Sequence, residues 1–178
     1  TDVPAVYEKI QTYLTEYQPE DLHKLRLYRD CLLPLYKLYA LEDVLSGLLE
    51  KRVWLKSGGF LVIEQTEAFV SIDVNTGKYV SNKKSQETYH KINLEAAREI
   101  AFQLRLRNLS GIILVDFINL NQPEYENELI YEFRKCLKRD RVKTDVVDMT
   151  ALKIVEVTRQ KVRRPVSEDF EALEHSFL

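Results

Sequence analysis

The fold of this chain is decided by residues 58–77, which read GGFLVIEQTEAFVSIDVNTG. Residues 68–75 alternate with a period of two, which predicts a β-strand with one apolar face packed on a core. A short strand over residues 61–63 precedes it, so the pair predicts a β-hairpin. Asp73 and Asn75 lie on the other face of the second strand, near its end. The hairpin therefore places a carboxylate and an amide close together at one end of a sheet.

A second carboxylate ends the apolar run Gly111–Asp116, which predicts a strand that is buried on both faces, parallel and central. Ligands of open α/β sheets bind outside the carboxyl ends of the strands, where Asp116 would lie. Two aspartates and an amide suit Mg²⁺, which is typically held by one or two carboxylates with water and phosphate. The pattern alone also fits a simpler interpretation, in which Asp73 caps a turn and Asp116 caps the next helix.

The composition is that of a globular protein: 178 residues are enough for one domain, or one and a half, with a proper core. No apolar run approaches the roughly 20 residues of a membrane span, and no signal peptide opens the chain. Cys31 and Cys136 lie far apart and predict no disulfide framework, so we expect each to be a small buried hydrophobe. Cytoplasmic localisation is the resulting expectation.

The net charge of −2 provides no global basic field, which counts mildly against a dedicated nucleic-acid binder. Basic residues do gather locally, at residues 134–143 and 159–164. Such runs are usually solvated helix faces, and we interpret the first group in this way.

Hydrophobic periodicity predicts an α/β fold (mixed α+β), with a mixed sheet and flanking helices. Asn93 is expected to cap its helix, Trp54 to be a core anchor, and residues 77–91 to form a mobile polar loop beside the site. The helical N-terminal third is expected to belong to another unit. The expected helices span residues 3–17, 34–52, 93–107 and 123–139, and the remaining expected strands span residues 23–28, 53–55, 145–148 and 153–159.

Several segments, in this order and spacing from about Pro34 to Lys161, resemble the ribonuclease E/G family. The match is far more specific than any one motif in it. The segments that carry it are Ser57-Gly58-Gly59, Ile63-Glu64-Gln65-Thr66-Glu67-Ala68, Ile72-Asp73-Val74-Asn75, Asn93-Leu94-Glu95-Ala96-Ala97, Gln103-Leu104-Arg105-Leu106-Arg107 and Val115-Asp116-Phe117-Ile118.

The resemblance implies a domain organisation. Residues 1–56 would be the C-terminal part of an RNase H-like subdomain, residues 57–164 a DNase I-like catalytic subdomain, and residues 165–178 a C-terminal tail. It implies that Asp73 and Asp116 hold a catalytic Mg²⁺ and that Asn75 orients one of them.

The implied reaction is endonucleolytic hydrolysis of single-stranded, AU-rich RNA, which leaves 5′-phosphate and 3′-hydroxyl ends. A bound Mg²⁺ suits this chemistry because it neutralises developing charge and lowers the pKa of a bound water. Arg105, Arg107 and Arg159 are the candidates for contact with RNA. Each could instead form structural ion pairs, and for Arg159 the two alternatives are evenly balanced.

The chain also departs from the family pattern. The S1 RNA-binding and 5′-sensor domains that would precede this segment are absent, which implies a fragment of a longer nuclease. The family's Cys-Pro-x-Cys zinc link is replaced by Val162-Arg163-Arg164-Pro165, its Arg-Phe-Gly by Ala151-Leu152-Lys153, and one of its acids by Asn119. These changes affect residues that the family pattern would use to bind RNA and to form the homo-oligomer that the resemblance implies.

Two alternative functions remain open. A phosphatase or phospho-accepting receiver also places aspartate at strand ends, but a phosphatase of that kind needs Asp-x-Asp, and Asn75 stands at the second position. A non-catalytic nuclease-like module that binds RNA or protein is the other alternative. The presence of both Asp73 and Asp116 favours the catalytic hypothesis over this module.

Overall fold

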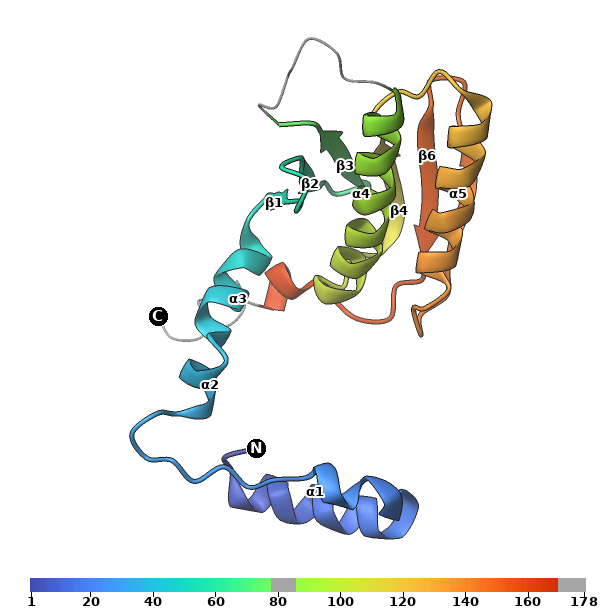
Figure 1. Ribbon diagram of the computed structural model, residues 1–178. Coiled ribbons are helices and arrows are strands. Elements are labelled where there is room, and N and C mark those ends of the chain that lie inside the picture. Colours follow the sequence, from blue (N-terminus) through green and yellow to red (C-terminus); the bar gives the residue numbers. More distant parts are fainter. Residues whose placement is uncertain (78–85, 170–178) are drawn as a thin grey trace. The chain divides into compact units, whose positions relative to one another are not determined.

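The computed structural model describes residues 1–77 and 86–169, and the chain divides into two compact units, Thr1–Gly47 and Leu48–Leu178 (Figure 1). The expected mixed α/β class is confirmed by helices and a six-stranded mixed sheet. The division into compact units falls after Gly47, and the subdomain boundary expected after residue 56 stays a prediction. The subdomain names given to the two parts stay predictions.

The first unit contains the helices α1 (Pro4–Tyr17), η1 (Pro19–Lys24) and α2 (Leu35–Leu38), and α3 (Leu41–Leu49) begins within it. None of the residues 1–47 is buried, so this unit has no core of its own.

Three predictions in the first unit were wrong. The strand expected at residues 23–28 is the end of a short 3₁₀ helix followed by irregular chain. Pro19 favours a first helical turn, and none of the described strands pairs with residues 25–28. The single helix expected after Pro34 is broken at Ala40, where φ is 47°. Cys31 is exposed rather than buried.

The second unit is built on strands β1 (Arg52–Trp54), β2 (Phe60–Gln65), β3 (Phe69–Asn75), β4 (Gly111–Asp116), β5 (Thr144–Met149) and β6 (Ile154–Arg159). Their order in the sheet is β1-β2-β3-β4-β6-β5. The pair β3–β4 is parallel and every other pair is antiparallel. The expectation of a central β4 is confirmed, since β3 and β6 flank it. The expectation that it is buried on both faces was wrong, because Ile112 is 54% exposed, and it is parallel only to β3.

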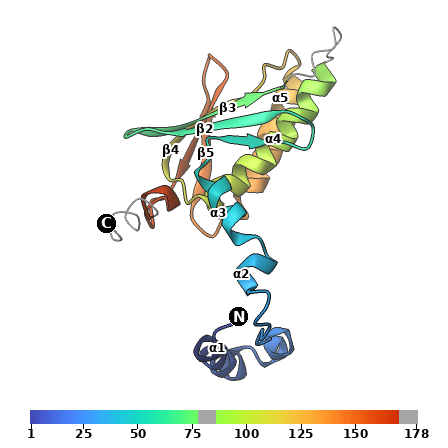
Figure 2. The ribbon, with the colours of Figure 1, turned by 90° about the vertical axis from the view of Figure 1, so that its left-hand side faces the viewer.

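Helices α4 (Gln86–Leu106) and α5 (Pro123–Leu137) cover one face of this sheet, as Figures 1 and 2 show. Alternate residues of β3 point into the resulting core, which also contains the α4 stripe Ala97, Ile100 and Leu104. The opposite face of the sheet carries no helix among the described residues of the second unit. We call it the open face.

Asn93 does not cap α4, as the sequence predicted, but lies fully buried inside it. The helix already includes Gln86, because buried contacts of His90 and Ile92 extend the apolar face beyond the stripe visible in the sequence. Trp54 is not a core anchor: its side chain is 63% exposed.

Residues 78–85 of the expected mobile loop and residues 170–178 of the tail lie outside the described residues. Among the described helices, none combines the length and the apolar character that a membrane crossing requires.

Candidate functional site

The register of two parallel strands brings Asp73 and Asp116 side by side. Asp73 of β3 is the direct partner of Asp116 of β4, on strands that lie about 4.8 Å apart. One residue earlier, the partners Ile72 and Val115 are both buried in the core, so the two aspartates share the open face. Both are exposed. The juxtaposition expected from the sequence is therefore present.

Asn75 lies on the same face, two residues beyond Asp73. Its Nδ2 donates a hydrogen bond to Oδ2 of Asp73 over 2.7 Å. This contact holds the Asp73 carboxylate in one orientation. It leaves Oδ1 of Asp73 and the Asp116 carboxylate available for a ligand.

The electrostatics of the pair favour a cation. Partial burial and, second, the charge of Asp73 raise the pKa of Asp116. Within residues 1–77 and 86–169, no ion pair joins either carboxylate to a lysine or arginine. The two like charges therefore lie side by side, and no cation of residues 1–77 or 86–169 is paired with them.

A glycine turn supports the end of β3. A Cβ on Gly59 would come within 2.7 Å of the Asn75 carbonyl oxygen, and one on Gly77 would overlap the Gly58 carbonyl. Both Gly58 and Gly77 have positive φ, which only glycine adopts easily. The Ser57-Gly58-Gly59 motif is therefore explained by close backbone approach beside the acidic pair.

Glu95 of α4 fixes the same turn from the helical side. Its carboxylate accepts hydrogen bonds from the backbone N–H groups of Lys56, over 2.7 Å, and Ser57, over 3.2 Å. The helix thereby sets the position of the chain that leads into β2.

Asn93 fixes the chain that leaves β4. Its Nδ2 donates to the Ile118 carbonyl over 2.7 Å, and its Oδ1 accepts from the Ile118 N–H over 3.1 Å. Ile118 is two residues beyond Asp116. The Asn-Leu-Glu-Ala-Ala motif therefore contributes two side chains, Asn93 and Glu95, that position the backbone around the site.

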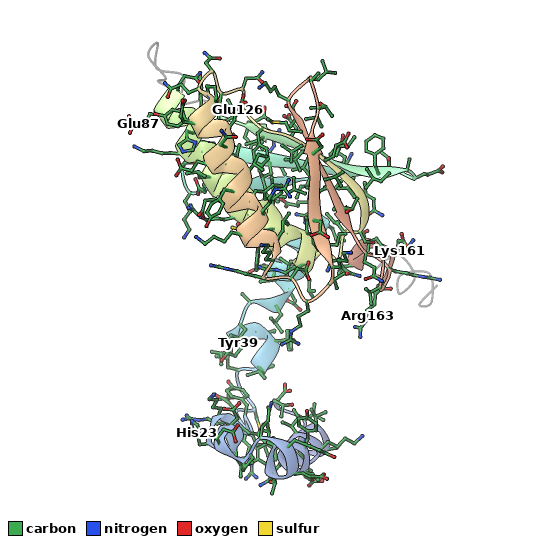
Figure 3. The ribbon with its side chains drawn as sticks, turned by 90° about the vertical axis from the view of Figure 1, so that its right-hand side faces the viewer. His23, Tyr39, Glu87, Glu126, Lys161 and Arg163 are labelled. Carbon is green, nitrogen blue, oxygen red and sulfur yellow. The ribbon has the colours of Figure 1, made fainter. Side chains whose placement is uncertain are left out.

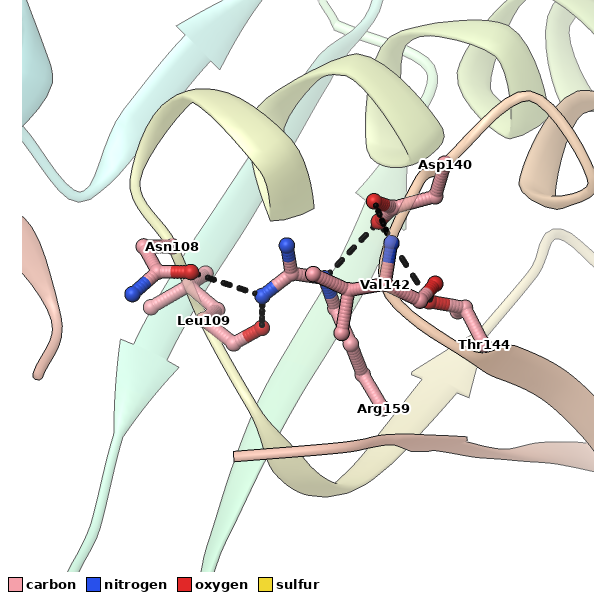
Figure 4. Close-up of polar contacts among 6 residues, drawn as sticks. All are labelled: Asn108, Leu109, Asp140, Val142, Thr144 and Arg159. Atoms are coloured by element: carbon pink, nitrogen blue, oxygen red, sulfur yellow. Dashed lines mark hydrogen bonds and ion pairs between the residues drawn. The ribbon is translucent and has the colours of Figure 1, made fainter. Parts of the chain in front are cut away.

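Arg159 serves the fold rather than the open face. It is 5% exposed, and its Nε donates to Oδ2 of Asp140 over 2.8 Å (Figure 4). Its Nη1 donates to Oδ1 of Asn108 and to the Leu109 carbonyl. Of the two alternatives that the sequence left open, bracing of the structure accounts for these contacts.

Arg107 is also buried, at 7% exposure. It donates through Nε to Oε1 of Gln103 and through Nη1 to the Glu50 carbonyl. Arg105 is exposed and remains the arginine of this group whose contact with RNA stays a prediction.

The basic residues at positions 134–143 and 161–164 are exposed. Lys161 and Arg163 project beyond the end of β6, at the opposite end of this unit from Glu87 and Glu126 (Figure 3). In the group at residues 134–143, Arg134 donates to the Val146 carbonyl, as a structural residue does.

Sequence reasoning missed two features near the acidic pair. Lys153, in the segment that replaces Arg-Phe-Gly, has a φ of 66°, a backbone conformation that suits the glycine of the family pattern. Its Nζ donates to both carboxylate oxygens of Glu126 over 2.8 Å. Trp54 and Phe60 form an aromatic contact on the open face. The positive φ could have been suspected from the missing glycine, whereas no local signal showed that Trp54 is exposed.

The donor set suits a hard divalent cation that keeps open positions. Among the described residues, no group of three or more His, Cys, Asp and Glu side chains could hold a metal. Two carboxylates beside an amide provide fewer ligands than a closed cage does. That is the arrangement in which Mg²⁺ retains water and binds phosphate.

Comparison with known proteins identifies a family and several relatives that this chain resembles in sequence. The sequence model of the Ribonuclease E/G family matches residues 1–162. Ribonuclease G of Escherichia coli (strain K12) is 40% identical over 165 residues, which is 93% of this chain and 34% of that protein. Ribonuclease G of Haemophilus influenzae is 40% identical over 174 residues, 98% of this chain and 34% of that protein. Ribonuclease E of Synechocystis is 36% identical over 163 residues, 90% of this chain and 24% of that protein. The chain therefore spans about a third of the length of the two ribonuclease G relatives, since the aligned part is 34% of each of them.

Proposed function

The chain belongs to the ribonuclease E/G family, and on that premise we propose that it forms the catalytic core of a Mg²⁺-dependent endoribonuclease. Its substrate would be single-stranded RNA, with AU-rich segments preferred, cut to 5′-phosphate and 3′-hydroxyl ends. The observation that carries the proposal is the pairing of Asp73 with Asp116 on the open face, with no compensating cation among the described residues.

Each residue of the site has a role in this proposal. Asp73 and Asp116 hold the metal, and Asn75 keeps the Asp73 carboxylate in its orientation. A divalent ion held there would neutralise charge on the phosphate and lower the pKa of a bound water. Without a cation, the two carboxylates would repel the phosphodiester, so binding of substrate at this point requires the metal.

The open face would give an extended RNA strand access to the carboxylates, since none of the described helices of this unit covers it (Figure 2). Most of the grip on RNA would come from parts of the protein outside this chain, among them S1-like and 5′-sensor domains, and a homo-oligomer would be one form of the whole protein. We place the reaction in cytoplasmic RNA processing, in line with two cysteines that are both free. A non-catalytic module would not explain why Asp73 and Asp116 lie side by side without an ion-pair partner among the described residues.

The test compares Asp73→Asn and Asp116→Asn in the native protein that carries this chain. Cleavage of a labelled single-stranded RNA is followed across a series of Mg²⁺ concentrations. We expect each variant to lose at least about 100-fold in rate, because loss of a metal ligand removes several kcal/mol of charge stabilisation.

The matched control is Asp145→Asn. Asp145 is an exposed strand aspartate that pairs with Thr158 at the other end of the open face, without a carboxylate beside it. Its variant should keep a rate within about twofold of the original. Substantial Mg²⁺-dependent cleavage by either site variant would show that the metal is held elsewhere.

A further inference from the structure

A cluster of aromatic side chains lies on the open face next to the acidic pair. Trp54 of β1 and Phe60 of β2 are direct partners in the sheet, and their ring centroids are 5.3 Å apart at an interplanar angle of 58°. Trp54 is 63% exposed, although it is a large apolar residue. An exposed tryptophan at the edge of a sheet presents a flat surface that this unit does not use in its core.

Arg52 adds a positive charge to this cluster. Its guanidinium carbon lies 4.5 Å from the Phe60 ring centroid and 5.7 Å from that of Trp54. The nearby Glu64 is paired with Lys51 over 2.8 Å, and no ion pair to Arg52 is found in the described parts of the chain. Its charge is therefore available to a phosphate.

The strand register connects this cluster with the carboxylates. Arg52 is paired with Val62, which is paired with Asp73. In the next row of the same face, Phe60 is paired with Asn75. Neighbouring strands lie about 4.8 Å apart, so Phe60 is one strand spacing from Asn75 and Trp54 is two.

Cross-strand packing explains only part of this arrangement. An aromatic pair on neighbouring strands stabilises a hairpin, which accounts for the contact between the two rings. It does not account for the exposure of Trp54, or for an arginine that forms no ion pair with a described carboxylate. Proteins bind single-stranded nucleic acid with this combination, in which bases stack on aromatic rings and on arginine while a positive charge meets the backbone.

We propose that Trp54, with Phe60 and Arg52, forms a stacking subsite for a base of single-stranded RNA, adjacent to the nucleotide whose phosphate lies at Asp73 and Asp116. The base stacks on the exposed ring of Trp54, and Arg52 binds the phosphate next to it. This subsite rests on the proposed function for its substrate. It adds a contact that holds the strand in place beside the metal ligands.

The test measures binding of a short, non-cleavable single-stranded RNA analogue to the native protein in the presence of Mg²⁺, so that the phosphate can bind at Asp73 and Asp116 without being cut. Trp54→Ala should weaken binding about 5- to 100-fold, the range for loss of one stacked base. Trp54→Phe should retain most of the affinity. Tyr131→Ala is the matched control, because Tyr131 is a 66% exposed aromatic residue on α5, away from the open face.

A scan of abasic nucleotides identifies the partner of Trp54. One abasic position near the cleaved bond should weaken binding to the original protein and cause no further loss in Trp54→Ala, because both changes remove the same contact. Equal losses at every abasic position in both proteins would overturn the proposal. So would unchanged RNA binding by Trp54→Ala.

Two further readouts separate the remaining outcomes. Trp54→Leu keeps apolar packing in β1, and amide exchange of β1 and β2 checks that the hairpin is intact. A change in oligomeric state with unaltered RNA binding would assign Trp54 to a protein interface and overturn the subsite. If one abasic position and Trp54→Ala remove the same contact while Asp73→Asn still cleaves, the subsite is supported and the proposed metal chemistry is wrong.

Discussion

The two ends of β4 carry charged groups that the fold treats in opposite ways. At the start of the strand, Gly111 pairs with Arg159, whose buried charge is met by Asp140 and by two oxygen acceptors. At its end, Asp116 lies beside a like charge, Asp73. We call the first the neutralised end, because its charges are paired, and the second the acidic end, because no described residue forms an ion pair with its carboxylates.

The pKa values of the two aspartates follow this difference. Hydrogen bonds from Arg159, the Val142 N–H and Thr144 outweigh burial and lower the pKa of Asp140. Burial and the charge of Asp73 raise the pKa of Asp116. A carboxylate that is held ionised by its partners has a structural role, whereas one that is held at an energetic cost is a candidate for a functional role.

The largest effect on stability is expected from breaking the neutralised end. Arg159→Ala leaves Asp140 buried without its cation, which should lower the unfolding free energy of the sheet by about 3–5 kcal/mol. Asp73→Asn should change it by less than about 0.5 kcal/mol, since an exposed like charge is removed. Amide hydrogen exchange of β4 and β6 in the native protein measures both effects.

A double variant keeps this prediction testable where Arg159→Ala unfolds the sheet. Replacing both partners, as Arg159→Met with Asp140→Leu, should recover part of the lost protection, because no buried charge is left unpaired. An Arg159→Ala protein with unchanged exchange would show that the two ends of β4 do not differ in this way.

An intermediate effect is expected at Asn93, which supports the acidic end through the backbone. Asn93→Ala removes two hydrogen bonds and leaves the Ile118 N–H and carbonyl without a partner, at a cost of about 1–3 kcal/mol. The Ile118 amide should exchange faster, and cleavage should fall by less than in Asp116→Asn. Asn127→Ala is the control, because Asn127 is exposed on α5.

If the Ile118 amide keeps its protection in Asn93→Ala, the acidic end does not depend on α4. The two ends of β4 would then differ only in how their charged side chains are paired. A slower exchange in both asparagine variants would point to helix propensity instead, since alanine favours helix over asparagine at either position.

The sequence predicted the acidic end better than the neutralised end. The alternation of β3 and the apolar run of β4 are local signals. The first contains Asp73 near its end and the second ends on Asp116, and the register then brings the two aspartates together. Arg159 and Asp140 are nineteen residues apart, and only the β5–β6 turn brings them into contact. No periodicity encodes such a pair, so the sequence left the role of Arg159 open.

The errors at Asn93 and Trp54 have related causes. Asparagine is a favoured N-cap, and the polar residues before it hid the first turns of α4, which tertiary contacts bury. Trp54 lies on a three-residue edge strand, where the register with Phe60 decides which face it occupies. Propensity carries no information about either outcome.

The smallest effect is expected in the pH dependence, where the two ends should respond with opposite signs. The pKa of Asp140 is lowered in the folded state, so its stabilisation is present above its unfolded pKa and is lost as the pH falls toward the folded value. The pKa of Asp116 is raised, so its contribution is present below its unfolded pKa and is lost as the pH rises through the folded value.

Carboxyl NMR titration of the metal-free protein separates the two causes at Asp116. In Asp73→Asn the pKa of Asp116 should fall, because the like charge is gone, yet remain above its ordinary value, because burial is the larger cause. The pKa of Asp140 should not move in this variant, since Asp73 is not among the groups that shift it. An Asp116 pKa that is the same with and without Asp73 would mean that the two carboxylates do not interact across the strands, and the acidic end would lose the feature that sets it apart from the neutralised one.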